Sequence, residues 1–132
     1  MPLLTRTFIK TGMTCLALAL ALGIALALGA TNGLFPVYIH LLVFGWLTQL
    51  IFGMVFWMFP KFSVEKPRGN ETLGWWTYAL LNSGLLLRAI AEPMQANQPS
   101  TISGWLLALS AIIQFLAGLT FVINSWGRVK EK

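Results

Sequence analysis

The chain has 132 residues, of which 57% are hydrophobic and 10% are charged, and its mean hydropathy is +0.74. Soluble proteins carry about 25% charged residues, so this composition excludes a soluble globular domain and indicates an integral membrane protein. The net charge is +5, but no basic element is long enough to follow a phosphate backbone. We therefore expect membrane lipids as partners and no nucleic acid.

The first predicted membrane span is the uncharged run 11–30, which follows the basic residues Arg6 and Lys10. About 20 apolar residues are enough to cross the hydrocarbon core as a helix. A cleaved signal peptide is the alternative, because small residues suited to cleavage end the run at Ala27, Gly29 and Ala30. The run is longer than the usual 7–15-residue signal core, which favours a retained span.

The second predicted span covers residues 37–59 and begins after a turn at 31–36, where Asn-Gly and Pro36 favour a tight connection. It contains His40, the only histidine of the chain, and a glutamine between two glycines. The short turn makes the first two spans antiparallel neighbours.

The third predicted span covers residues 73–91, with Glu92 and Pro93 as its end, and the fourth covers residues 102–126. A polar loop precedes the third span and a basic tail follows the fourth. The sequence therefore predicts an all-α fold, a four-helix transmembrane bundle forming one membrane domain over residues 1–132.

Lysine and arginine positions predict the orientation of this bundle. In the four-span topology eight of them lie on one side and none on the other, namely Arg6, Lys10, Lys61, Lys66, Arg68, Arg128, Lys130 and Lys132. Because basic residues are enriched in cytoplasmic loops, both termini are expected in the cytoplasm. We expect the chain in the inner (plasma) membrane of a bacterium.

Three amide side chains, Gln49, Asn82 and Gln114, fall near the midplane of their spans. An amide facing lipid would leave its polar atoms unpaired, so we expect these three to make interhelical hydrogen bonds. Gly45 and Gly53 lie four residues to either side of Gln49 and would let another helix approach it. A polar transport path along the amides is the alternative interpretation.

His40, Arg88 and Glu92 are the ionisable residues at the outer end of the predicted bundle. Arg88 and Glu92 are four residues apart and can pair on one helix face. At 100° per residue, His40 lies about 180° from Gln49 around the second span, so we expect the histidine to point away from the amides. A charge within the membrane is a functional-site hypothesis by default, while the structural alternative is an arginine that reaches the headgroups beside Glu92.

The sequence shows no catalytic constellation. One histidine and one cysteine cannot build a zinc or copper site within one chain. No phosphate-binding glycine loop or serine nucleophile motif occurs. We therefore expect no independent enzymatic activity and no catalytic residue.

The segment HLLVFGWLTQLIFGMVFWMFP, which begins at His40, and the later segment LGWWTYALLNSGLLLRAIAEP suggest a family. Together, over about residues 36–93, they resemble parts of the membrane subunit I proteins of haem–copper oxidases and of the related NnrS-like and oxidase-subunit-I-like small membrane proteins. That resemblance implies haem b as the cofactor and His40 as the iron ligand. It also implies Arg88 as a partner of a haem propionate or of Glu92. With four predicted spans and one histidine, the chain departs from the full oxidase subunit, so oxygen or nitric oxide reduction is not implied.

The resemblance implies a component of a respiratory or other electron-transfer membrane complex. The second iron ligand would come from another copy of the chain, a partner chain or a methionine. A cofactor-free structural or assembly subunit of a larger membrane complex is the first alternative. A small transporter or channel is the second.

Overall fold

The computed structural model describes residues 1–30 and 32–130, and every regular element in this part of the chain is helical. The elements are α1 (Leu3–Ala27), α2 (Leu34–His40), the π-helix η1 (Leu41–Leu47), α3 (Thr48–Met58), α4 (Glu71–Asn97) and α5 (Thr101–Trp126). The segments α2, η1 and α3 follow one another without a break and form a single helical rod. The expected all-α fold is therefore confirmed.

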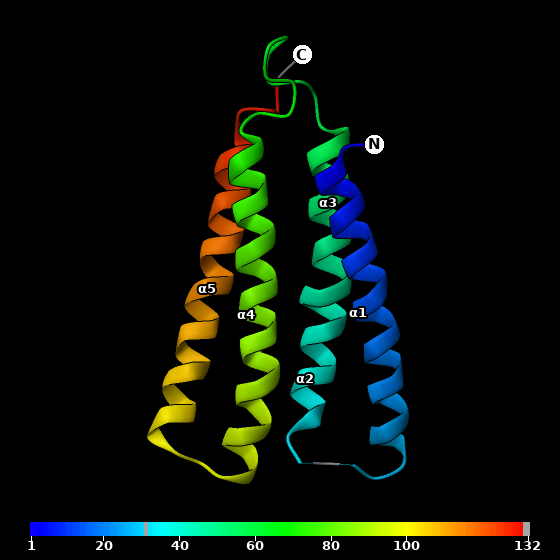
Figure 1. Cartoon of the computed structure of the whole chain (residues 1–132), viewed down its shortest axis with the longest axis vertical. Helices are drawn as coiled ribbons and strands as arrows, with labels where there is room; N and C mark the ends of the chain where they lie inside the picture. Colours follow the sequence, from blue (N-terminus) through cyan, green and yellow to red (C-terminus); the bar gives the residue numbers. More distant parts are fainter. Residues whose placement is uncertain (31, 131–132) are drawn as a thin grey trace.

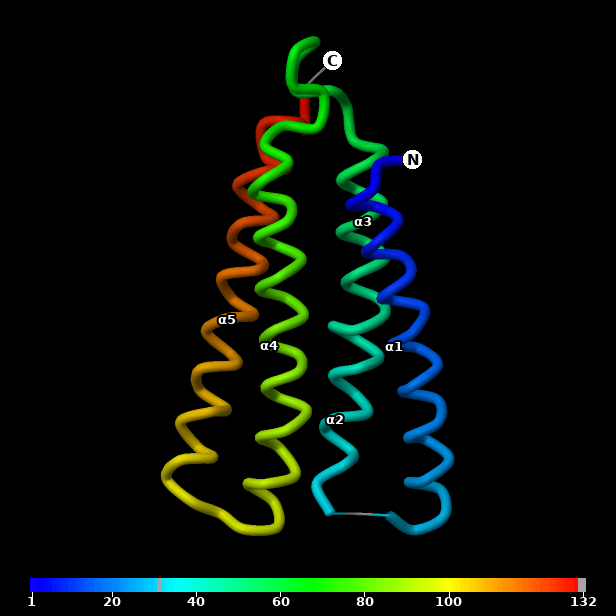
Figure 2. The backbone as a smooth tube through the Cα atoms, viewed as in Figure 1, coloured from blue at the N-terminus to red at the C-terminus, as the bar shows by residue number. Residues whose placement is uncertain are grey.

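The helices form two antiparallel hairpins that lie side by side (Figure 1). One hairpin pairs α1 with the α2–η1–α3 rod, and the other pairs α4 with α5; α4 also contacts α2 and η1. The backbone trace places both termini and the α3–α4 loop at one end, here called the terminal end (Figure 2). The α1–α2 and α4–α5 connections lie at the opposite end, here called the turn end.

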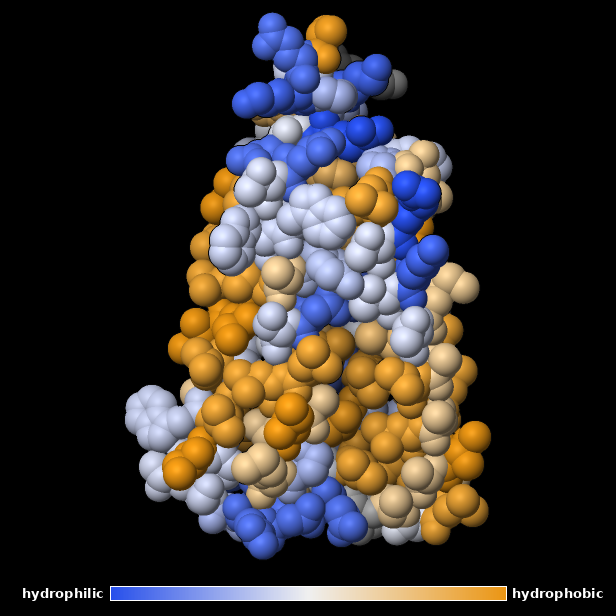
Figure 3. All heavy atoms as spheres, in the orientation of Figure 1, coloured by the Kyte–Doolittle hydropathy of each residue, from blue (hydrophilic) through white to orange (hydrophobic). Residues whose placement is uncertain are grey.

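Three rods are long and apolar enough to cross a membrane, namely Leu3–Ala27, Leu34–Met58 and Thr101–Trp126. Helix α4 has a similar length, but its charged and polar residues lower its hydropathy. In the space-filling view, hydrophilic residues gather at both ends of the visible face, and hydrophobic residues cover much of the surface between them (Figure 3). This distribution of hydrophilic and hydrophobic surface is the one expected of a membrane protein, as the composition predicted.

Two helices extend beyond the predicted membrane spans. Helix α1 starts at Leu3, so Arg6 and Lys10 lie within it and not before it, and it ends at Ala27. No helix-breaking residue separates Leu3 from the apolar run, and Thr5 in this first part donates a buried hydrogen bond of 3.1 Å to the carbonyl oxygen of Gly53. Tertiary packing therefore extends the helix beyond the uncharged run.

Helix α4 continues through Pro93 to Asn97, six residues beyond the predicted end at residue 91. Proline removes one backbone hydrogen bond but does not have to end a helix whose neighbours hold it in place. Here the α1–α2 turn provides that contact, because the backbone of Gly33 packs against the turn of α4 around Pro93. The side chain of Asn97 also donates a hydrogen bond of 3.3 Å to the carbonyl oxygen of Asn32.

The turn itself follows the sequence prediction at Gly33, which adopts a left-handed φ of 72°. Two predicted features lie outside the described residues: Thr31, the first residue of this turn, and Lys132, one of the basic residues used to predict orientation.

Close helix packing depends on glycines of the second rod. A Cβ atom at Gly45 would lie 2.8 Å from the Cβ of Cys15, and one at Gly53 would lie 2.8 Å from the Cβ of Phe8. Neither distance is tolerated between real side chains, so the rod and α1 can meet this closely only because both positions are glycine. Around Phe8 the core is aromatic, with edge-on contacts to Phe52 and Tyr78 at 6.4 and 5.2 Å between ring centroids.

Candidate functional site

His40 is the last residue of α2 and lies in the half of the rod nearer the turn end. Its Nδ1 is 2.7 Å from the carbonyl oxygen of Pro36, one helical turn earlier, and its ring stacks on Phe44 at 5.9 Å between centroids. These two contacts hold the imidazole from its own helix. Two contacts within the α2–η1–α3 rod therefore help to orient the ring.

Helix α4 brings Arg88 and Glu92 to this imidazole. Nη1 of Arg88 is 3.0 Å from Nε2 of His40 and 3.4 Å from Oε1 of Glu92. Oε1 of Glu92 is also 3.2 Å from Nδ1 of His40. The structure thus assembles these three residues into one cluster, called the His–Arg–Glu cluster below.

The contacts to Arg88 and Pro36 fit one tautomer of His40. A guanidinium only donates hydrogen bonds, so Nε2 must accept from Arg88 and is unprotonated. The proton is then on Nδ1, which donates to the carbonyl oxygen of Pro36. In this arrangement His40 is a neutral imidazole whose Nε2 lone pair is directed at α4.

The cluster also leaves two buried atoms without partners. Among the described residues, Nε of Arg88 and Oε2 of Glu92 have no hydrogen-bond partner. The side chain of Glu92 is only 10% exposed and that of Arg88 20% exposed. A buried charged group with an unused donor or acceptor is costly, and a bound ion or ligand is one explanation for it.

The predicted angle between His40 and Gln49 was wrong, because it assumed a continuous α-helix. A π-turn, with its i to i+5 hydrogen bonds, takes one more residue than an α-turn. This extra residue changes the angle between His40 and Gln49 around the helix axis by about 100°. Both side chains consequently face α4, where Gln49 contacts Asn82 and His40 contacts Arg88. Segments of π-helix inside α-helices are frequent at functional sites, and the seven-residue η1 begins directly after the histidine.

Two of the three predicted midplane amides pair with each other. Gln49 Nε2 donates to Asn82 Oδ1 at 2.9 Å, and Asn82 Nδ2 donates back to Gln49 Oε1 at 3.3 Å. Gln114 does not join them. It packs against Gly84 of α4, and its Nε2 is buried without a partner among the described residues. The pair is closed on itself, which makes interhelical packing a simpler account of it than a transport path.

Sequence reasoning missed the role of Arg128, which it counted only as a charge on the cytoplasmic side. Arg128 is 1% exposed, and its guanidinium donates to the carbonyl oxygens of Phe56, Phe59 and Pro60 at 2.8, 2.8 and 3.0 Å. These carbonyls end α3 and have no intrahelical donor. Burial lowers the pKa of Arg128, and the charge of Arg68 lowers that pKa further. The residue therefore caps α3 from the tail after α5, a role with no signature in sequence.

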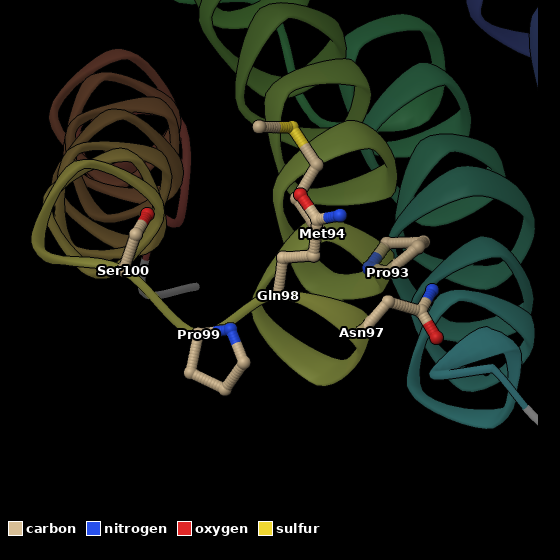
Figure 4. A pocket seen from close by; sticks show the side chains of 6 residues that line it. All are labelled: Pro93, Met94, Asn97, Gln98, Pro99 and Ser100. Atoms are coloured by element: carbon tan, nitrogen blue, oxygen red, sulfur yellow. The ribbon is translucent and has the colours of Figure 1, made fainter.

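An open pocket of about 410 Å³ lies at the turn end, between the end of α4 and the start of α5 (Figure 4). Its lining is Pro93, Met94, Asn97, Gln98, Pro99 and Ser100, and none of the three cluster residues contributes to it. The pocket and the cluster are therefore separate features.

Comparisons with protein-family models, with curated proteins and with solved structures found no match to the chain. The resemblance to oxidase subunit I thus stays an interpretation of the sequence. The structure adds the positions of the side chains. Among the sites described above, the His–Arg–Glu cluster brings the most ionisable groups together.

Proposed function

We propose that this chain is a small multi-span component of an electron-transfer membrane complex and that it binds haem b through Nε2 of His40. The observation that supports this proposal most is the hydrogen bond from Nδ1 of His40 to the carbonyl oxygen of Pro36, at 2.7 Å. Metal-binding histidines characteristically donate their second ring nitrogen to a carbonyl or carboxylate, which fixes the tautomer and the ring.

The donor set fits haem better than it fits a bare metal ion. The described residues contain no group of three or more histidine, cysteine, aspartate or glutamate side chains that could hold a metal ion. A haem needs less from the protein, because the porphyrin supplies four ligands and a protein side chain only an axial one. His40 would supply that ligand, and Arg88, displaced from Nε2, would pair with Glu92. The group would supply one-electron transfer.

Binding requires Arg88 to move, because its Nη1 lies 3.0 Å from the nitrogen that would hold the iron. The second axial ligand would come from a second copy of this chain, a partner chain or a methionine. The complex would be a homo-oligomer or a larger assembly.

For the membrane topology we propose that α4 is the fourth span and that both termini are cytoplasmic. The two described ends differ in charge in a way that supports this orientation. The terminal end has the basic residues Arg6, Lys10, Lys61, Lys66, Arg68, Arg128 and Lys130, and the two connections at the turn end have none. This is the distribution expected if the terminal end faces the cytoplasm of a bacterial inner membrane.

A cofactor-free structural subunit is the second candidate, and one observation favours it. With Arg88 on Nε2 and Pro36 on Nδ1, both nitrogens of His40 have partners without any ligand. In that case the cluster would only join α2 to α4, and the apolar outer surfaces of α1 and α5 would contact lipid or larger subunits.

A visible absorption spectrum separates the two candidates. We expect the full-length protein, purified in detergent from a haem-replete host, to show a Soret band and reduced-minus-oxidised bands typical of haem b. His40→Ala should abolish them, while Gln49→Leu, which disrupts the neighbouring amide pair, should keep them. Circular dichroism and gel filtration would establish that both variants remain folded. No bands in the wild type, or unchanged bands in His40→Ala, would favour the structural subunit.

A further inference from the structure

The His–Arg–Glu cluster contains an ion pair that is incompletely formed. A carboxylate and a guanidinium pair most strongly through two parallel hydrogen bonds. Here Arg88 and Glu92 share only one contact, of 3.4 Å between Nη1 and Oε1. The atoms that would make the second bond, Nε of Arg88 and Oε2 of Glu92, are both buried and have no partner among the described residues.

The missing second bond results from the position of Nη1. That nitrogen lies closer to Nε2 of His40, at 3.0 Å, than to Glu92. Arg88 and Glu92 are one turn apart on α4, so a change of side-chain rotamer is enough to bring the whole guanidinium onto the carboxylate. In that second position both unused atoms gain a partner, and Nε2 of His40 becomes free.

Contacts within its own rod would hold the imidazole during such a change. Its ring is held by the carbonyl oxygen of Pro36 and by stacking on Phe44, both in its own rod. Losing Arg88 therefore exposes the Nε2 lone pair without releasing the ring.

We infer that Arg88 and Glu92 form a two-position latch that controls access to Nε2 of His40. In the closed position, which the structure shows, Arg88 covers Nε2. In the open position Arg88 forms a two-bond pair with Glu92, and Nε2 is available to an iron porphyrin. The inference rests on the proposed haem-binding function for its ligand, and it makes Arg88 and Glu92 positioning residues and not ligands.

The single histidine allows a direct test without haem. Full-length protein labelled with ¹⁵N only in histidine gives two ring nitrogen signals in NMR, both from His40. We expect a protonated Nδ1 and an unprotonated, hydrogen-bonded Nε2. In Arg88→Met the Nε2 signal should shift towards that of a free lone pair, and the Nδ1 signal should stay. An unchanged Nε2 signal in Arg88→Met would overturn the latch, and so would a wild-type spectrum with the proton on Nε2.

The second arm measures the affinity of the haem-free protein for added haemin, followed by the Soret shift. Arg88→Met, and Arg88→Leu, which adds no possible iron ligand, should bind haemin more tightly than the wild type, because no side chain has to be displaced. Glu92→Gln should bind it more weakly, by about fivefold or more, because Arg88 loses its alternative partner. Leu86→Ile, an exposed position on the same helix, is the matched control and should bind like the wild type.

The two arms separate the latch from the proposed function. If the NMR shifts occur but no variant binds haemin, the proposed function is wrong and the closed position of Arg88 stands. If haemin binds equally to wild type, Arg88→Met and Glu92→Gln, the latch is wrong and haem binding stands. Arg88→Leu provides a second variant if Arg88→Met does not fold: it has no hydrogen-bond donor for Nε2 and should likewise lose the wild-type Nε2 shift.

Discussion

At the scale of single residues, the Gln49–Asn82 pair and the His–Arg–Glu cluster differ in how completely their polar atoms are paired. Gln49 is fully buried and exchanges two hydrogen bonds with Asn82. The His–Arg–Glu cluster instead has two buried atoms without partners among the described residues. A closed amide pair needs nothing further, whereas an incomplete charged cluster gains from a rearrangement or a ligand. This contrast is why we assign packing to the first and function to the second.

The amide pair predicts a measurable coupling between Gln49 and Asn82. Gln49→Leu or Asn82→Leu alone leaves the partner amide unpaired and should lower the free energy of unfolding by about 1–3 kcal/mol. The double variant should lose less unfolding free energy than the two single variants lose together. The difference, the coupling energy, should be about 0.6–2 kcal/mol. Unfolding by SDS in mixed micelles measures these values, with exposed Ser83→Ala as the control. Strict additivity would show that the amides do not interact.

Several of these residue-level features could be predicted from sequence and others could not. Depth along the helices was enough to group His40 with Arg88 and Glu92, because residues at equal depth in a small bundle have few other neighbours. Which atoms meet depends on rotamers, so the contact between Arg88 and Nε2 had no sequence signal. Arg128 was read as a surface charge because nothing in its local sequence shows that α3 ends beside it.

At the scale of elements, the decisive feature is the π segment η1. It turns His40 and Gln49 to the same neighbour, α4, although α-helical periodicity separates them by half a turn. Gly45, within η1, lies against Cys15 of α1, and any side chain there would prevent this approach. Hydrophobic periodicity cannot reveal a π-turn in a span that is apolar on all sides, so the sequence predicted the rod but not its register.

A second question about single elements is whether helix α4 crosses the membrane. Ser63 precedes α4 and Ser100 follows it, so a spanning α4 places them on opposite sides. In a Cys15→Ala background, which keeps the Cβ packed at Gly45, we expect an impermeant maleimide to label Ser100→Cys from the periplasmic side of intact cells. Ser63→Cys should react only after the membrane is opened. Labelling of both from the same side would contradict a spanning α4.

At the scale of the whole molecule, two hairpins meet along α4, and the proposed haem site lies at their junction near the turn end. Length and apolar character predicted the number of helices and their antiparallel order. The extension of α1 to Leu3 and of α4 to Asn97 came from contacts between elements far apart in the chain. With one histidine, a single chain can supply only one histidine ligand to a haem iron. A bis-histidine haem therefore needs a second copy or a partner.

The central claim is that His40 is an iron ligand, and its most direct test is electron–nuclear double resonance of the oxidised, full-length protein labelled with ¹⁵N only in histidine. Because His40 is the only histidine, any histidine nitrogen coupled to the iron belongs to it. We predict a haem iron signal whose axial coupling changes from ¹⁴N to ¹⁵N on labelling. A haem signal without ¹⁵N coupling, or protein that carries no haem iron, would contradict the account.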